Sequence, residues 1–266
     1  MRELIFSADD FGLTPAVNEA VEQGCRLGRL TQASLMVAAP AAADAVARAN
    51  ALPALNVGLH LVLVDGDSLL GHEKLPHITG PDGRFSADQA RLGVKYFFSP
   101  AARRELRAEI EAQFAAFAAT GLRLHHADAH KHFLLHPTIA AMMIEVGRKY
   151  GLTRLRIPAE PPHVMKALGE RVSFGDYALY AWTRLLRFQA RGLELPDQVF
   201  GIKWSGHMTR ERIEKLLPLL PPGRTEIYFH PATERDETLN HLMPDYEHVK
   251  EYEALLATYR SSHPML

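Results

Sequence analysis

Acidic and imidazole side chains occur at four places where short apolar runs end or are interrupted. Asp9 and Asp10 follow the first such run, His60 interrupts another, His130 lies in the run HHADAHKH, and His230 follows a late run. An apolar core rejects such groups unless their charge is offset. Because ligand groups gather at the carboxyl ends of the strands in parallel α/β folds, these five residues are candidates for one site.

The run HADAHKH carries the sharpest local pattern. Its ionisable residues recur at a spacing of two and line one face of a predicted strand: His126, Asp128, His130 and His132. A solvent-facing strand is the alternative interpretation, but a parallel strand is usually covered on both sides. The pattern therefore favours metal binding or catalysis.

Two imidazoles and one carboxylate that leave coordination positions open form a common site for a divalent metal. Such an ion lowers the pKa of bound water and polarises a carbonyl group. Asp10, His60 and His130 are the predicted ligands, and one divalent ion, magnesium or zinc, is the expected cofactor. Sites of this kind accept several ions, so the sequence does not select between them.

The neighbouring acids Asp9 and Asp10 need a local explanation, since adjacent residues of a regular strand point to opposite faces. Both address one site only where the strand ends and Phe11 and Gly12 begin a turn, and they lie at such a point. One acid then binds metal, while the other, Asp9, acts as general base. In the alternative interpretation, one acid only caps the turn.

Strand-like and helix-like segments alternate along the whole chain. Strands are predicted at residues 3–8, 33–38, 55–64, 122–130, 154–157 and 226–229. Helices are predicted from residue 15 and at residues 40–51, 100–120, 137–150, 209–217 and 245–259. The alternation favours a parallel sheet, either open and doubly wound or closed into a (β/α) barrel, and about seven mainly parallel strands suit the barrel slightly better.

We expect one α/β domain over residues 1–266, since no internal repeat or linker divides the chain. Residues 65–99 lose the periodicity and are rich in Gly, Pro, Asp and His. A loop of this length is uncommon unless it is functional. We therefore predict a long insertion at about 65–99 that passes over the site.

The composition excludes several classes of protein. The chain has 30 basic and 31 acidic residues, so no strong field favours nucleic acid, and no nucleic-acid partner is expected. A single cysteine, Cys25, allows no internal disulfide. The chain opens on a strand-like run instead of a signal peptide, and no apolar run reaches the roughly 18 residues of a membrane span. We expect a cytoplasmic protein.

Residues 174–195 form an unusually aromatic, helix-like segment that contains Trp182 and Phe188. Most such stripes belong to the core, and this is the favoured interpretation. The alternative is that part of the segment is exposed and receives an apolar substrate or a second subunit. Its arginines, Arg184 among them, suit an interfacial helix as well as a solvated face. Peripheral contact with the inner membrane and a homodimer are therefore among the expected interactions.

The tripeptide DFG at residues 10–12 also occurs in protein kinases, where it holds magnesium. Only nine residues precede Asp10, which leaves no space for a glycine-rich loop or a lysine-bearing strand. A phosphate-binding loop of the Walker type is absent as well. The motif therefore does not indicate a kinase.

Several segments together resemble the YdjC-like carbohydrate deacetylases: SADDFG, VGLHLVLVDG, DAHKHFLLHP and YFHPA, in the same order over nearly the whole chain. The hopanoid biosynthesis-associated branch is the most similar, through TPAVNEAV, ASLMVAAPAAADAV, GLHLVLVDG, YFFSP and AHKHFLLHPT. The resemblance implies a NodB-related, barrel-like fold, a divalent metal and removal of acetyl from an N-acetylated sugar, which the branch carries on a bacteriohopane lipid. The chain departs from the wider family at Ala129, where many relatives have serine.

The resemblance also implies roles for single residues. Asp10, His60 and His130 are similar to the family's metal ligands, Asp9 to its general base and His230 to a general acid. In that scheme Asp9 takes a proton from the attacking water, and His230 protonates the departing amine.

Two functions from other classes stay open at this point. A non-catalytic sugar- or lipid-binding relative would keep the metal site, but it needs neither Asp9 nor His230. A metal hydrolase for another bond, such as a phosphoester, usually needs two metals, and the sequence offers one convincing ligand set. Soluble chito-oligosaccharides are the alternative to a glycolipid substrate.

Overall fold

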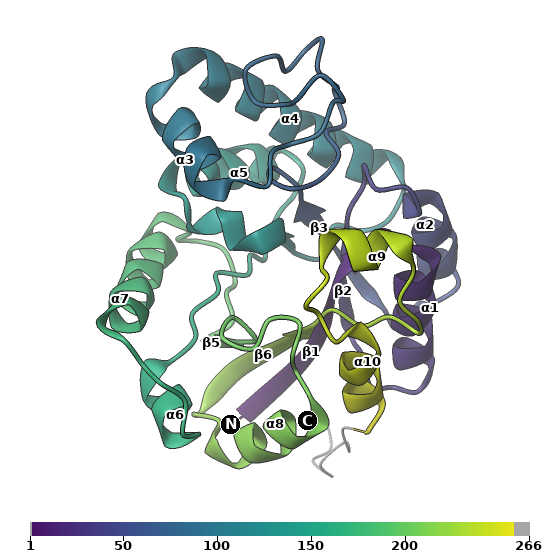
Figure 1. The fold of residues 1–266 in the computed structure, drawn as a ribbon, viewed down its shortest axis with the longest axis vertical. Coiled ribbons are helices and arrows are strands. Elements are labelled where there is room, and N and C mark those ends of the chain that lie inside the picture. The colour runs from purple at the N-terminus through teal and green to yellow at the C-terminus, as the bar shows by residue number, and fades with distance from the viewer. Residues whose placement is uncertain (1, 258–266) are drawn as a thin grey trace.

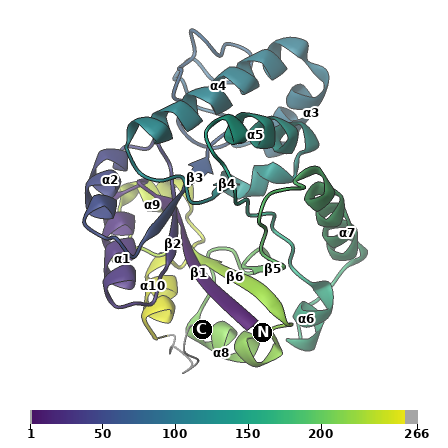
Figure 2. The same ribbon diagram turned by 180° about the vertical axis from the view of Figure 1, so that it is seen from behind.

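A parallel sheet forms the centre of the molecule. The computed structural model describes residues 2–257, and these form six strands in the order β4-β3-β2-β1-β6-β5, each paired neighbour parallel (Figures 1 and 2). The strands span Arg2–Phe11 (β1), Gln32–Leu35 (β2), Asn56–Leu61 (β3), Ala127–Ala129 (β4), Gln198–Phe200 (β5) and Gly223–Phe229 (β6). The predicted parallel α/β architecture is confirmed.

The described residues form six strands where about seven were expected. The predicted strand at residues 154–157 forms no ladder, and β5 is a strand that the sequence did not predict. The segment at residues 154–157 pairs with Ala127 of β4 and with Glu194 only through isolated bridges. Two residues further on, the carbonyl of Ala159 accepts a hydrogen bond from the amide of Val199 in β5. The prolines that follow residue 157 lack the amide hydrogen that a longer ladder needs. The segment therefore links the two edge strands through a few bonds, which makes the sheet barrel-like.

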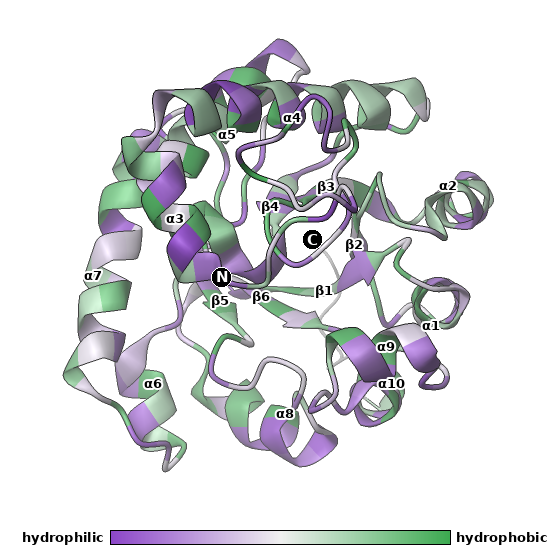
Figure 3. Cartoon of the chain, turned by 45° about the horizontal axis from the view of Figure 1, so that its top comes forward, coloured by the Kyte–Doolittle hydropathy of each residue, from purple (hydrophilic) through white to green (hydrophobic). Residues whose placement is uncertain are grey.

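Helices surround the strands, as Figure 3 shows. They span Pro15–Arg26 (α1), Ala42–Asn50 (α2), Gln89–Phe98 (α3), Pro100–Ala119 (α4), His130–Leu135 (η1, a 3-10 helix), Pro137–Lys149 (α5), Pro162–Ala167 (α6), Phe174–Gln189 (α7), Arg210–Leu216 (α8), Leu217–Leu219 (η2), Glu237–Leu242 (α9) and His248–Ala257 (α10). The predicted end of the last helix, at residue 259, lies outside the described residues. Within residues 2–257, no helix combines the length and hydropathy needed to cross a bilayer.

Two helix starts occur where the sequence predicts them. The side chains of Thr14 and Ser99 each accept a hydrogen bond from an amide in the first turn of α1 and α4. Pro15 and Pro100 are the first residues of these helices. A capping hydroxyl followed by proline suits a helix start because proline lacks an amide hydrogen and its φ is already helical.

The segment at residues 65–99 is less irregular than predicted, because its last third forms α3. Asp88 caps this helix by accepting a hydrogen bond from the amide of Arg91 (2.9 Å). Leu92 and Tyr96, one turn apart, are its buried side chains. Two buried positions are too few to give a helical period in the sequence. The irregular part is therefore confined to residues 65–88.

The predicted strand at residues 122–130 is also shorter in the structure. β4 ends at Ala129, η1 begins at His130, and Lys131 and His132 adopt positive φ angles of 50° and 52°. The spacing of two in HADAHKH therefore does not describe a single strand face. The backbone instead leaves the sheet at His130, at the carboxyl end of β4.

β1 ends in a bulge that places two adjacent acids on the same side. Its register with β2 shifts between Ala8 and Phe11, and Asp10 adopts a φ of 60°. A regular strand would send Asp9 and Asp10 to opposite faces. The irregular backbone lets both side chains approach His60, which lies in one cluster with each of them.

Asn18 of α1 holds the turn that follows these acids. Its Oδ1 accepts a hydrogen bond from the amide of Gly12 (2.7 Å), and its Nδ2 donates to the carbonyl of Ala41 (3.0 Å). The side chains of Asp9 and Asp10 bind other partners, described below. The alternative interpretation, in which an acid caps this turn, is therefore wrong.

Gly12→Ala is expected to destabilise the fold more than Gly169→Ala. Both glycines have positive φ, 98° and 86°, so alanine at either position costs about 1–2 kcal/mol of backbone strain. Only at Gly12 does the added Cβ also lie 3.2 Å from atoms of Leu35, Met36 and Ala42, whereas nothing lies within 4 Å at Gly169. Urea unfolding of the two variants measures the difference. Equal losses would contradict the close packing of the turn.

Candidate metal centre and active site

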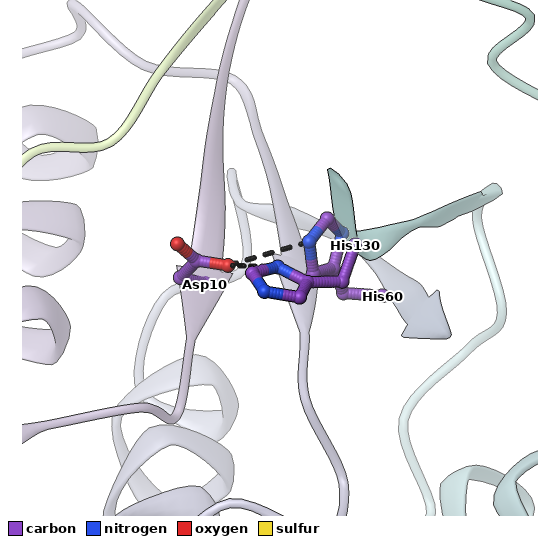
Figure 4. Close-up of side chains that lie close together, drawn as sticks. All are labelled: Asp10, His60 and His130. Carbon is purple, nitrogen blue, oxygen red and sulfur yellow. Dashed lines mark hydrogen bonds and ion pairs between the residues drawn. The ribbon is translucent and has the colours of Figure 1, made fainter. Parts of the chain in front are cut away.

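Three predicted ligands meet at the carboxyl ends of neighbouring parallel strands. Asp10 comes from the end of β1, His60 from β3 and His130 from the start of η1 (Figure 4). Asp10 Oδ1 lies 3.3 Å from His60 Nε2 and 3.1 Å from His130 Nδ1. One ligand atom from each residue lies within 4.8 Å of the other two, and all three residues are buried.

The donor atoms of this cluster fit a divalent metal ion. Asp10 Oδ2 is buried and has no hydrogen-bond partner, which is costly for a carboxylate unless a cation is nearby. Burial alone would raise the pKa of Asp10, but the neighbouring imidazoles, His130 above all, lower it well below its usual value. An ionised oxygen and two imidazole nitrogens suit zinc and its neighbours, and three protein ligands leave positions open for water or substrate.

Asp128 fixes the orientation of the His60 ring. Its Oδ1 lies 2.7 Å from His60 Nδ1, and its Oδ2 accepts a hydrogen bond from Ser34 Oγ (2.7 Å). Because a carboxylate only accepts, we assign the proton of the imidazole to Nδ1, which leaves the lone pair of Nε2 directed at Asp10. A carboxylate behind a histidine in this way is the usual support of a metal ligand.

Asp9 is held separately, by a buried arginine. Arg156 NH1 and NH2 donate to the two carboxylate oxygens of Asp9 (3.1 and 2.6 Å). The same guanidinium pairs with Asp128 and lies 3.4 Å from Glu226 Oε1. Arg156 itself is only 3% exposed. A fork-shaped, bidentate contact of this kind fixes both the position and the charge of a carboxylate.

The surroundings of Asp9 and Glu226 shift the pKa values of these two acids in opposite directions. Burial by itself raises the pKa of Asp9, but Arg156, followed by His60 and His230, lowers it below the usual value, so Asp9 is ionised. For Glu226 the outcome is the reverse, because burial outweighs Arg156 and raises its pKa. Ser7 Oγ donates a hydrogen bond to Glu226 Oε1 (2.6 Å).

His230, which follows β6, lies beside a buried carboxylate. Glu251 of α10 accepts a hydrogen bond from the backbone amide of His230, and its Oε2 lies 3.8 Å from His230 Nδ1. Burial disfavours the charged imidazole, but Glu251 and the charges of Asp10 and Asp9 raise the pKa of His230 above its usual value. The raised pKa favours the protonated form of the His230 ring.

The two remaining histidines of HADAHKH have different surroundings. His126 Nε2 lies 3.1 Å from Ser34 Oγ, and burial lowers its pKa well below the usual value. His132 Nε2 lies 2.6 Å from the hydroxyl of Tyr228, and burial lowers its pKa to about 4. Both rings are therefore neutral and pack beside the candidate site. Neither histidine belongs to the group of potential ligands formed by Asp10, His60 and His130.

A cavity of about 530 Å³ opens beside His130. Residues 65–67 and 84 contribute polar groups to one wall, and α9 contributes Glu237, Thr238 and His241. Its apolar lining comes from Leu13, Met36, Ala38, Ala39, Pro40, Val62, Leu242 and Met243. The cavity therefore offers hydrogen-bonding groups and apolar surface next to one predicted ligand.

Comparison of the sequence with known protein families identifies one family. The family model described as YdjC-like protein matches residues 3–259. The chain belongs to the YdjC-like family. The family predicted from the sequence motifs is thereby confirmed, while the hopanoid-associated branch remains a prediction.

Two relatives of this YdjC-like chain are named carbohydrate deacetylases. A carbohydrate deacetylase of Thermoanaerobacter pseudethanolicus is 28% identical over 97% of this chain and 91% of its own length. A carbohydrate deacetylase of Brevibacillus brevis is 36% identical over 60% of this chain and 59% of its own length. A crystal structure from Enterococcus faecalis V583, whose name refers to cellobiose-phosphate cleavage, matches with a TM-score of 0.74 at 24% identity, over 97% of this chain and 91% of that one. This last similarity shows the same fold.

The sequence pointed to the ligand candidates of this YdjC-like protein but not to the residues that hold them. Arg156 lies within a predicted strand, and the only local signal of its buried charge is its position between Leu155 and Ile157. Glu251 is fully buried in α10, on the same face as Leu255, where an apolar residue is expected. A charged residue within an apolar pattern was thus the available signal in both cases.

Asp128→Asn is expected to weaken metal binding by about 10–100-fold, because the substitution removes the negative charge behind the His60 ring. Titration calorimetry of metal-free protein with Zn²⁺ measures the affinity. Asp197→Asn is the matched control, since Asp197 accepts a hydrogen bond from the amide of Arg224 at the other end of the sheet. Equal affinity in the wild type and Asp128→Asn would rule out this supporting role.

Proposed function

We propose that this YdjC-like protein is a metal-dependent carbohydrate deacetylase that hydrolyses the acetamide of an N-acetylglucosamine-type sugar. The supporting observation is that two adjacent carboxylates are held in different ways within one buried cluster. Asp10 faces two imidazoles, whereas Asp9 is bound by Arg156 and lies outside the ligand set. The relatives named carbohydrate deacetylases support the same substrate class.

In this proposal Asp10, His60 and His130 hold one divalent metal ion, magnesium or zinc. When bound, such an ion lowers the pKa of water and stabilises negative charge on the acetamide oxygen. The orphaned Oδ2 of Asp10 and the Nε2 lone pair of His60 are the donor atoms that support it.

Asp9 is the proposed general base. It accepts a proton from the water that attacks the acetamide carbon. Arg156 keeps Asp9 ionised and fixes both carboxylate oxygens. Because the same contact lowers the pKa of Asp9, the carboxylate is a weak base, and the reaction needs the acidified water that the ligand triad is proposed to provide.

His230 is the proposed general acid. When the C–N bond breaks, acetate is released and the amine nitrogen takes up a proton, without which it is a poor leaving group. Glu251 and the nearby aspartates raise the pKa of His230, which favours the protonated ring that this role requires. The backbone contact with Glu251 also fixes its position at the end of β6.

For the substrate, we propose N-acetylglucosaminyl bacteriohopanetetrol, which would be converted to its glucosaminyl form. The support is the resemblance of the sequence to the hopanoid-associated branch and the mixed polar and apolar cavity beside His130. Such a cavity suits a sugar that carries an apolar group.

We also propose that the protein is a cytoplasmic homodimer in peripheral contact with the inner membrane. Analytical ultracentrifugation tests the dimer.

Soluble chito-oligosaccharides are the alternative substrates, and a non-catalytic sugar- or lipid-binding protein is the alternative function. Binding alone gives no reason for a buried carboxylate outside the ligand set, Asp9, or for the contact that joins His230 to Glu251. A two-metal phosphoesterase is disfavoured for a further reason. The second cluster of potential ligands, Asp9, His60 and Asp128, already has the guanidinium of Arg156 on both carboxylates, so a cation is present there.

Acetate release from N-acetylglucosaminyl bacteriohopanetetrol and from chito-oligosaccharides tests the proposal. We expect release from the glycolipid, loss of activity after complete chelation, and recovery on addition of Zn²⁺ or Mg²⁺. Turnover of the soluble sugars alone would contradict the lipid substrate. Activity that survives complete metal removal would contradict the metal-dependent mechanism.

Asp9→Asn is expected to lower kcat by about 10²–10⁴-fold, because an amide cannot accept the proton. Zn²⁺ affinity should stay close to that of the wild type, since Asp9 is not a proposed ligand. Asp197→Asn again serves as the control. Acetate release by Asp9→Asn at the wild-type rate would remove Asp9 from the mechanism, and a loss of metal binding would place it among the ligands instead.

A further inference from the structure

Helices α3 and α7 carry an exposed apolar surface, the α3–α7 face. Its six large side chains are Phe97, Phe98, Phe174, Tyr177, Leu185 and Phe188. Phe174 is 88% and Phe98 75% exposed. Seven of the eleven exposed large apolar side chains of residues 2–257 lie on these two helices. Such a concentration, unlike scattered exposed leucines, marks an interaction surface.

α7 has two apolar sides, of which only one packs on the protein. Thr183 and Leu186 are buried, and Trp182 Nε1 donates a hydrogen bond to the carbonyl of Leu135 (2.8 Å). The exposed residues at positions 174, 177, 185 and 188 fall together on the opposite side of the helix. The sequence prediction that the aromatic segment belongs to the core is therefore wrong for half of α7, whose outward side is exposed to solvent.

α3 and α7 lie on the same side of the molecule, with α5 packed against both (Figures 1 and 3). The ring of Phe97 lies 6.1 Å from that of His136, measured between centroids. The residue before His136, Leu135, is the one that binds Trp182 of α7. The two groups of exposed side chains are therefore joined through the start of α5.

The face is also connected to the candidate active site. Gln89 Nε2, in the first turn of α3, donates a hydrogen bond to the carbonyl of Lys131 (3.1 Å). Lys131 directly follows His130, the predicted ligand at the start of η1. Whatever binds the α3–α7 face therefore lies on the side of the barrel from which His130 enters the site.

The positive charge of α3 and α7 favours a negatively charged partner. α3 and α7 contain four basic residues and one acidic residue, although the whole chain carries a net charge of −1. The acidic residue, Asp176, is paired with Lys203 (3.2 Å), and one of the basic residues, Arg187, is paired with Asp197 (4.0 Å). The other three, Arg91, Lys95 and Arg184, are in no ion pair among the described residues. Arg191, just beyond α7, lies over the ring of Phe188, 3.3 Å from its centroid. Exposed aromatic rings beside arginines are typical of helices that lie in the interface of an anionic membrane.

We propose that the α3–α7 face docks on the surface of a bilayer that contains anionic phospholipids. A second copy of the chain fits less well, because a twofold contact would place the same basic helices against each other. The aromatic rings enter the headgroup region, and Arg184 remains at the phosphates. The purpose of this contact rests on the proposed glycolipid substrate, but the contact itself can be measured without it.

Flotation with phosphatidylcholine vesicles, with and without phosphatidylglycerol, tests the docking. We expect the full chain to float with the vesicles that contain phosphatidylglycerol, and to float less at high salt, because the charged contacts are screened. The variant Phe174→Ser/Phe188→Ser/Arg184→Glu is expected to bind these vesicles about tenfold less tightly or worse. Its circular dichroism spectrum and melting temperature should match those of the wild type, which shows that it folds.

The matched control is Leu27→Ser/Arg210→Glu, which changes exposed residues near the end of α1 and on α8. Wild-type binding by this control is expected. The docking proposal is overturned if the wild type does not float, if control and test variant lose binding equally, or if the test variant only dissolves a dimer in ultracentrifugation. Vesicle binding without turnover of the glycolipid would instead overturn the proposed substrate and leave the docking intact.

Discussion

The candidate site depends on one buried cation, the guanidinium of Arg156. It contacts carboxylates from three strands, Asp9 of β1, Asp128 of β4 and Glu226 of β6. Carboxylates so close together would repel one another in a buried interior, and removing the partner of a buried charge typically costs about 3–5 kcal/mol. Through Asp9 the cation fixes the proposed base, and through Asp128 it fixes the ring of His60. The charge of Asp9 at the end of β1 and the orientation of His60 on β3 thus both depend on Arg156.

One guanidinium does not balance all the buried carboxylates. The surplus negative charge acts on the groups that can hold a proton, since the charge of Asp9 contributes to the raised pKa values of both Glu226 and His230. Asp10, which Arg156 does not reach, keeps one oxygen without any partner. A divalent cation at Asp10 would offset this surplus where it is least compensated. The partnerless oxygen of Asp10 and the raised pKa of His230 therefore arise from the same imbalance.

The sequence predicted local features well and distant ones poorly. His60 and His130 were found because an ionisable residue in an apolar run is a local signal, and parallel strands bring their ends together. Arg156 was missed because its partner Asp9 lies 147 residues away, and no local pattern encodes that pair. The alternation of strands and helices gave the architecture, but the three-residue strand β5 is too short to show a period.

α7 illustrates a different limit of sequence reasoning. An aromatic stripe in a helix-like segment usually belongs to the core, so the pattern alone favoured core. The deciding contact is tertiary: Trp182 binds the carbonyl of Leu135, which turns one side inward and leaves Phe174 and Phe188 in water. Exposed apolar area costs roughly 25 cal/mol per Å² relative to burial, so this side does not contribute to the stability of the isolated fold. This exposed side of α7 stabilises the protein only when another apolar phase covers it. That contact would lie on the side of the barrel where η1 begins.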